Sequence, residues 1–135
     1  MKYWLMKSEP SVYSWDQFVR DKKTNWNGVR NYTARNNMQA MKRGDHVFFY
    51  HSNEGMEIVG LAEVIKEAYP DPTDTTGKFV MVDIKPVKKA KTPLTLAAIK
   101  ADPLLKNMQL VKQSRLSVSA VTADEYKKIC KLTGL

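Results

Sequence analysis

Hydrophobic residues recur along this chain with two different periods, which predict strands in some segments and helices in others. Near the N-terminus, aromatic and apolar residues 3–7 form a short run that Pro10 ends, which predicts a first strand. Later runs alternate with period two, are rich in β-branched and aromatic residues, and are separated by turn-forming stretches. These runs predict strands at residues 46–51, 57–66, 79–85 and 115–121.

Apolar positions with helical spacing occur next to residues that cap helices. Ser14 and Gln17 have the spacing of a capping box, as do Thr122 and Glu125, so we expect helices to begin just after Ser14 and Thr122. Residues 104–113 fit neither period. The other expected helices lie at residues 32–41 and at residues 92–101, and the expected apolar face of the first helix is Trp15, Phe18 and Val19.

The length and the mixed order of elements predict one α+β domain over residues 1–135. Gly60 and Ala62 alternate with larger apolar residues and leave little bulk on one face of their strand. Such a face occurs where a sheet curves or another chain segment approaches closely. We therefore expect a small curved β-barrel flanked by short α-helices.

Charge is unevenly distributed along the chain. The formal net charge is +8, made of +5 over residues 1–45, −5 over residues 46–84 and +8 over residues 85–135. If the two basic segments share a face, they form a surface that attracts phosphates. The alternative is a solvated lysine surface that serves solubility, and the Lys85–Lys91 stretch fits either interpretation.

The amino-acid composition also indicates the cellular compartment in which we expect the protein. The single cysteine, Cys130, rules out an internal disulfide and fits a reducing compartment. No apolar run reaches membrane-spanning length, and residues 1–7 are too short and too soon charged for a secretory signal. We expect a cytoplasmic protein, with association with the nucleoid as a second option, no membrane partner and a monomeric state.

Motifs of several enzyme classes are absent. Neither Gly-x-Gly-x-x-Gly nor Gly-x-x-x-x-Gly-Lys occurs, which disfavours a dinucleotide site or a P-loop. His46 and His51 are five positions apart on one predicted strand, so they point to opposite faces and do not share a metal. Without His-x-Glu or Cys-x-x-Cys motifs, a zinc-dependent base deaminase is excluded. We expect no metal, no cofactor and no catalytic residue.

Residues 26–37 combine aromatic, guanidinium and amide groups in one polar stretch. Trp26 has no periodic apolar neighbours, so it is either a lid over the core or a surface on which a base stacks. Asn31 can read the donor and acceptor edge of a base, and Arg30 and Arg35 can neutralise phosphates. This chemistry favours a nucleic-acid partner.

Two further clusters are candidates for ligand contact. Lys7, Ser8 and Glu9 stand at the end of the first predicted strand, where they form either a ligand contact or a hydrophilic turn. Before the last predicted strand lies a second cluster that fits either contact with the nucleic-acid backbone or a solvated edge. Its members are Lys112, Ser114 and Arg115.

Five segments, in the same order, resemble the EVE-domain family nearly end to end. They are residues 2–10 (KYWLMKSEP), 26–32 (WNGVRNY), 48–53 (FFYHSN), 68–73 (AYPDPT) and 113–118 (QSRLSV). The resemblance implies a PUA-like fold, related to the YTH domains that read methylated adenine in RNA. It also implies a non-enzymatic reader of a modified base in DNA or RNA, with modified cytosine in DNA as the leading candidate.

The resemblance further implies roles for individual residues. Trp26 is the implied stacking wall, and Ser114 and Arg115 are the implied contacts to the nucleic-acid backbone. The other residues of the implied base pocket are Lys7 and Ser8 at the base edge, Asn31 as an edge-reading amide, and Tyr50, His51 and Ser52 on the opposite wall.

The chain departs from the YTH pattern because it lacks a fourth tryptophan to complete an aromatic cage, and Tyr69 or Phe79 is the expected substitute. Two other functions stay open. A related PUA-like amidohydrolase uses a lysine and a glutamate, which makes Lys7 and Glu9 candidates for hydrolysis of a modified base or nucleoside. A protein-interaction module is the other function that stays open.

Overall fold

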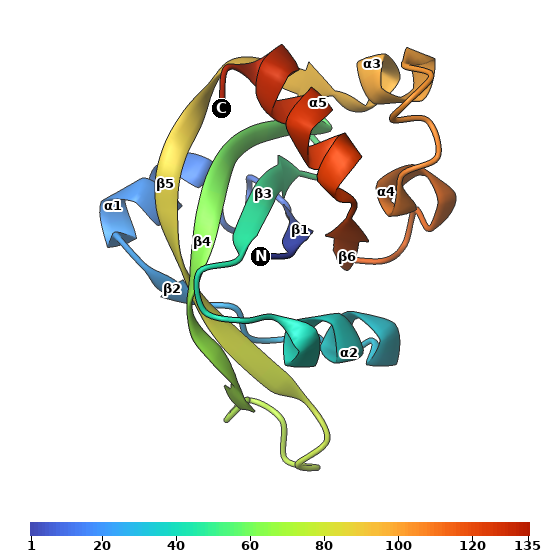
Figure 1. Ribbon diagram of the computed structural model, residues 1–135. Coiled ribbons are helices and arrows are strands. Elements are labelled where there is room, and N and C mark those ends of the chain that lie inside the picture. Colours follow the sequence, from blue (N-terminus) through green and yellow to red (C-terminus); the bar gives the residue numbers. More distant parts are fainter.

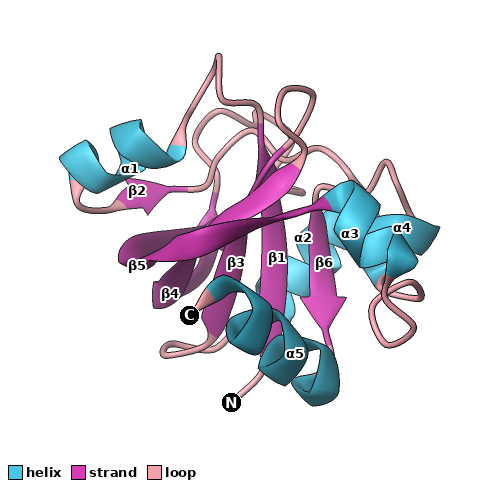
Figure 2. Ribbon diagram, turned by 90° about the horizontal axis from the view of Figure 1, so that it is seen from above, coloured by secondary structure: helices cyan, strands magenta, loops and turns pink.

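Six strands form one mixed sheet, and five short helices cover its two faces (Figures 1 and 2). The computed structural model describes residues 1–135. The strands are β1 (Tyr3–Ser8), β2 (Thr24–Asn25), β3 (His46–His51), β4 (Glu57–Pro70), β5 (Val80–Thr95) and β6 (Val118–Val121). The helices are α1 (Trp15–Asp21), α2 (Tyr32–Ala40), α3 (Leu96–Ala101), α4 (Gln109–Lys112) and α5 (Ala123–Thr133). None of the helices is both long enough and apolar enough to cross a membrane.

The strand order across the sheet is β2-β5-β4-β3-β1-β6. Neighbouring strands are antiparallel except for β1 and β3, which run parallel and place Lys7 beside Tyr50 and Ser8 beside His51. The α+β class and the curved sheet with flanking short helices are confirmed. The sheet does not close into a complete barrel, because its edge strands β2 and β6 are not paired with each other.

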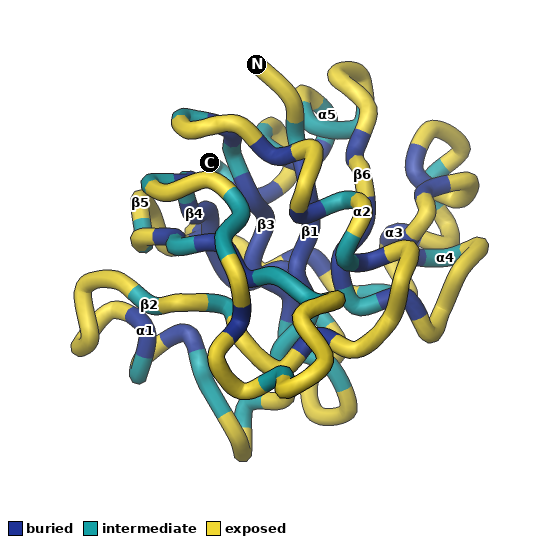
Figure 3. The backbone as a smooth tube through the Cα atoms, turned by 90° about the horizontal axis from the view of Figure 1, so that it is seen from below, coloured by how far each residue is buried: buried dark blue, intermediate teal, exposed yellow.

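The sheet is buried on both faces, and buried segments run along its central strands β1 and β3 (Figure 3). Alternation along these strands separates the two cores. Trp4 and Met6 of β1 pack into one core, whereas Leu5 between them packs into the other. Helices α1 and α2 supply Phe18 and Met38 to the first core. The second core is covered by α3, α4 and α5, which contribute Ile99, Leu110 and Ile129.

Several predicted boundaries are wrong for identifiable reasons. β5 continues to Thr95, beyond the expected end at residue 85, because its lysine-rich second half pairs with β4 as far as Thr95 opposite Glu57. The Thr95 side chain then caps α3, so that helix begins at Leu96 rather than near residue 92. Val19 was expected on the apolar face of α1, but it is 48% exposed, and only Trp15 and Phe18 of this helix are buried.

The two predicted capping boxes differ. Thr122 and Glu125 form a complete box at the start of α5. At α1, the Ser14 hydroxyl accepts a hydrogen bond from the Gln17 backbone N–H at 3.1 Å, but the Gln17 side chain donates to Asp21 instead of returning to the cap. Both helices nevertheless begin where the capping residues predicted.

Gly60 on β4 allows α1 to approach the sheet. A Cβ atom at this position would lie 2.5 Å from the Trp15 ring, well inside van der Waals contact. Trp15 is buried and packs edge-on against Phe49 of β3 at 5.5 Å. The small residue expected from the sequence therefore accommodates an indole rather than a second backbone.

Gly60→Ala is expected to destabilise the fold by about 1–3 kcal/mol, because the added methyl group overpacks a filled site. The measurement is urea unfolding followed by circular dichroism. In a Trp15→Leu background the same substitution should cost less than half as much, since the obstructing ring is gone. Equal costs in the two backgrounds would refute the contact as the cause.

Candidate functional site

The main candidate site is a 670 Å³ hollow at the C-terminal end of β1. Its walls come from three regions that are distant in the sequence: the end of β1 with the turn after it, β2 with the loop that follows it, and Ser117 just before β6. Lys7, Ser8 and Trp26 all line this hollow, so the structure brings together three of the predicted pocket residues. Glu9 and Arg30 also line it.

Trp26 is held by the core on one side and open to the hollow on the other. Its ring meets Phe49 edge-on at 5.7 Å and Tyr13 edge-on at 6.5 Å. Its backbone N–H donates to the Val82 carbonyl at 2.8 Å, which fixes the position of the indole on the sheet. Trp26 therefore packs against the core, as a lid would, and also forms a wall of the hollow.

Lys7 and Ser8 are fixed by hydrogen bonds to neighbouring segments. The Lys7 ammonium donates to the Ser114 carbonyl at 2.6 Å, and the Ser8 hydroxyl donates to the Tyr13 carbonyl at 2.5 Å. Partial burial lowers the pKa of the Lys7 ammonium below its ordinary value. Glu9 lines the same hollow but is exposed and forms no ion pair with Lys7.

Asp71, which the sequence did not single out as a site residue, anchors two residues that line the hollow, Gly28 and Arg30. Its buried carboxylate accepts hydrogen bonds from the Gly28 backbone N–H at 2.8 Å and from the Arg30 guanidinium at 3.1 Å. It also accepts from the backbone N–H and hydroxyl of Thr73. Although burial alone would raise its pKa, these donors together lower the pKa of Asp71 to about 2. The aspartate two positions before a threonine predicts the local bonds to Thr73, but no sequence signal indicates the contact with Gly28.

A second, polar hollow of 310 Å³ contains the predicted backbone-contact cluster. Lys112, Ser114 and Arg115 line it together with Asn31 and Thr33. Asn31 thus lies outside the hollow beside Trp26, and its side-chain oxygen caps α2 by accepting from the Ala34 backbone N–H at 2.9 Å. The Ser114 carbonyl that accepts from Lys7 connects the two hollows.

Arg30 and Arg35 take part in a stack of planar side chains beside the hollows. The Arg30 guanidinium lies 5.4 Å from the Phe79 ring centre, and Arg35 lies 4.8 Å from the Tyr32 ring centre. The Phe79 and Tyr32 rings are 5.2 Å apart. Arg35 also donates to the Lys78 carbonyl at 3.2 Å. Phe79 therefore packs with the arginines and does not complete a cage around Trp26.

The remaining predicted pocket residues do not line the hollow beside Trp26. Tyr50 is buried in the core under α3, α4 and α5, because its strand position faces away from Trp26. His51 accepts a hydrogen bond from the Trp15 backbone N–H at 3.1 Å, and burial lowers its pKa. Ser52 donates its backbone N–H to the Ser8 carbonyl at 2.9 Å. Tyr69 donates to Asp83 on the neighbouring strand.

His46 and His51 face opposite sides of the sheet, as their spacing predicted. His46 lies 2.6 Å from the Tyr126 hydroxyl of α5, whereas His51 meets α1.

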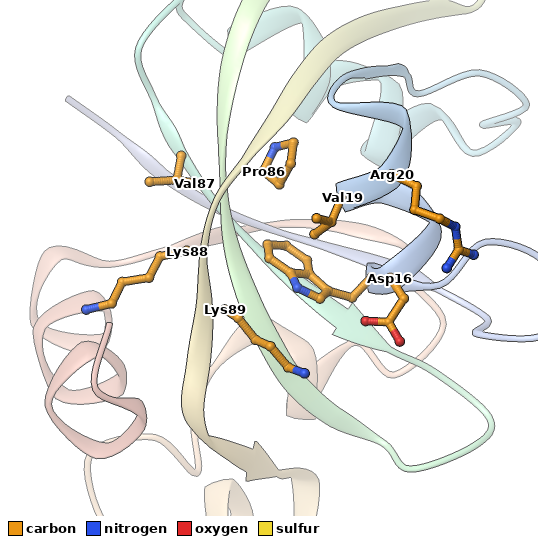
Figure 4. Close-up of a pocket in the computed structure, with 8 residues that line it drawn as sticks. Asp16, Val19, Arg20, Pro86, Val87, Lys88 and Lys89 are labelled. Carbon is orange, nitrogen blue, oxygen red and sulfur yellow. The ribbon is translucent and has the colours of Figure 1, made fainter.

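A further hollow of 510 Å³ lies between α1 and β5. Figure 4 shows Val19 and Pro86 close to one another there, with Arg20 and Lys88 on opposite sides. It contains none of the predicted site residues. Its exposed valines, Val19 and Val87, make it more apolar than the hollow that holds Lys112 and Arg115.

The chain is similar to one known sequence family and to several proteins of known structure. The sequence model of the EVE domain family matches residues 2–132. The solved structure of Rpa0253 from Rhodopseudomonas palustris matches with a TM-score of 0.94 and 62% identity, over 99% of this chain and 94% of that chain. Human thymocyte nuclear protein 1 is 36% identical over 164 aligned residues, which cover 96% of this chain and 73% of the human protein. The crystal structure of human THYN1 in complex with DNA containing 5-methylcytosine matches with a TM-score of 0.91 and 35% identity, over 100% of this chain and 99% of that chain.

Asp71→Asn is expected to lower the free energy of unfolding by about 1–3 kcal/mol at pH 7, because an amide cannot accept all the hydrogen bonds that the carboxylate accepts. The pKa of Asp71 is lowered from 3.8 to about 2, so its stabilisation is complete above pH 3.8 and is lost as the pH falls through about 2. The variant should lack that part of the acid dependence. Urea unfolding between pH 7 and pH 2 measures both effects, with Glu54→Gln on an exposed turn as the control. A variant with the stability and acid profile of the parent would rule out this role.

Proposed function

This chain belongs to the EVE domain family, and on that basis we propose that it binds nucleic acid and reads one modified base without altering it chemically. The observation that carries the proposal is the hollow beside Trp26. Its 670 Å³ volume falls within the range of about 300–1,000 Å³ that is typical of small-ligand sites. An indole face there offers a stacking surface worth about 1–3 kcal/mol per base.

Polar groups at the rim of the hollow suit the edge of a base. The Ser8 hydroxyl donates to Tyr13 and keeps lone pairs that can accept from a base amine. The Lys7 ammonium has one donor occupied by Ser114 and two donors left for base oxygens or ring nitrogens. These groups are already in place before a ligand binds, which reduces the entropy lost on binding.

Modified cytosine in DNA is the base we favour. A crystal structure of the relative human THYN1 contains DNA with 5-methylcytosine, and the match to this chain extends over its whole length. A methyl group in such a hollow contributes about 1–3 kcal/mol of preference.

The polar hollow beside the first supports contact with the flanking backbone. Lys112 and Arg115 are exposed there and form no ion pairs, so their charges are available to phosphates. Arg30 serves this role less well, since its guanidinium is already paired with Asp71. We therefore assign backbone contact first to Arg115 and Lys112.

Hydrolysis by Lys7 and Glu9 has weaker support. The lowered pKa of Lys7 is the property that a catalytic lysine needs. Its ammonium is instead hydrogen-bonded to the Ser114 carbonyl, and no ion pair joins it to Glu9. Both groups are better placed to hold a base than to activate a nucleophile.

Trp26→Ala is expected to remove the preference for oligonucleotides that carry 5-methylcytosine over plain ones, because the stacking wall is lost. Trp26→Phe should keep part of the preference, since a smaller ring remains. Fluorescence-anisotropy titrations with matched modified and plain oligonucleotides measure the ratio of affinities. A Trp26→Ala variant with the full preference would overturn the assignment of the hollow.

Arg115→Gln is expected to weaken binding to modified and plain oligonucleotides equally, because a phosphate contact carries no base information. The slope of log affinity against log salt concentration should fall in magnitude by about 1. Lys127→Gln is the matched control, since it removes one exposed cation from α5, which lines neither hollow. An unchanged salt slope in the Arg115 variant would exclude the contact.

A further inference from the structure

The turn between β1 and α1 carries an exposed valine at the rim of the hollow beside Trp26. Figure 2 shows the loop that joins β1 to α1 projecting beyond the ends of these elements. Val12 in this loop is 78% exposed, which is more than any other large hydrophobic residue of the chain. Single exposed aliphatic residues are common on protein surfaces, but this one also lines the hollow.

The turn is held rigidly, so Val12 has a defined position. The backbone N–H groups of Val12 and Tyr13 both donate to the Glu9 carbonyl, at 2.9 and 2.8 Å. The Ser8 hydroxyl closes the turn by donating to the Tyr13 carbonyl, and the Tyr13 hydroxyl is anchored by Asp21 of α1 at 2.9 Å. A β-branched side chain adds its own restriction at χ1.

An exposed, rigid, apolar side chain beside a base-sized hollow suits a duplex ligand. A base inside a duplex reaches such a hollow only if it leaves the stack, which costs a few kcal/mol. Apolar side chains that insert between base steps offset part of this cost, because they replace the stacking contact that is lost. In a single strand the base is already accessible, so an inserted side chain has little to offset.

We infer that Val12 is a wedge that enters the base stack when a modified base moves into the hollow beside Trp26, and that the ligand is therefore a duplex. The inference rests on the proposed function, since it assumes that a base occupies this hollow. It assigns Val12 a positioning role that is separate from recognition of the base itself.

The test compares Val12→Ser with the parent on two probes, a DNA duplex and a single strand, each with one 5-methylcytosine. Because burial of a valine side chain contributes about 1.5–3 kcal/mol, affinity for the duplex should fall by about 10- to 150-fold. Affinity for the single strand should stay within about twofold of the parent, since stacking on Trp26 is unchanged.

Two further variants serve as controls. Val19→Ser removes an exposed valine from α1, outside the hollow beside Trp26, and should bind both probes as the parent does. Val12→Leu keeps an apolar side chain and should retain most of the duplex affinity. Thermal unfolding of each variant checks that the turn still folds.

The outcomes separate the wedge from the proposed function. Equal losses by Val12→Ser on both probes, or no loss on the duplex, would overturn the wedge. If the parent binds the single strand no better with 5-methylcytosine than with cytosine, the proposed function fails instead. If the parent binds neither probe, both the wedge and the proposed function are overturned.

Discussion

Packing around Phe49 connects the core of this molecule to its candidate site. This fully buried ring on β3 meets Trp15 at 5.5 Å, Phe18 at 5.3 Å, Trp26 at 5.7 Å and His51 at 5.8 Å. One side chain therefore orients α1, the loop that carries Trp26, and the end of β3. The wall of the hollow takes its position from the core rather than from loop residues alone, which is the arrangement that a preorganised site needs.

The parallel pairing of β1 with β3 adds the second constraint. Together with the pairing to β6, it buries β1 between two strands, and Lys7 and Ser8 at the C-terminal end of β1 lie beside the loop of Trp26. Polar groups at such a strand end are available for a ligand, while the strand that carries them cannot shift without disrupting two cores. The polar groups of the site are therefore accessible, while the strand that carries them is buried.

Local patterns predicted much of this architecture. A short apolar run placed β1 correctly, alternation placed β3, and the capping residues Ser14 and Thr122 marked the starts of α1 and α5. Trp26 also lines a hollow with Lys7. A large ring without periodic apolar neighbours is not fully enclosed by the core, so part of its surface stays accessible.

Two of the errors concern residues whose strand position or helix-capping role decides where the side chain lies, and a third omission concerns a long-range contact. Tyr50 lies beside Lys7 in the sheet, but strand alternation directs its side chain into the core under α3, α4 and α5. Asn31 had an amide suited to base reading, yet the start of a helix uses its side-chain oxygen as a cap. Asp71 gained its role only because the hairpin brings it to Gly28, a contact between residues 43 positions apart. Long-range pairing of this kind has no signature in a single sequence.

That carboxylate has a consequence for the shape of the site. Asp71 lies just after β4, at the base of the hairpin loop, and bonds to Gly28 and Arg30, which line the hollow. The Arg30 guanidinium also donates to the Thr73 hydroxyl of the same loop at 2.9 Å. The geometry of the hollow therefore depends on a peripheral hairpin loop that contributes no side chain to its lining.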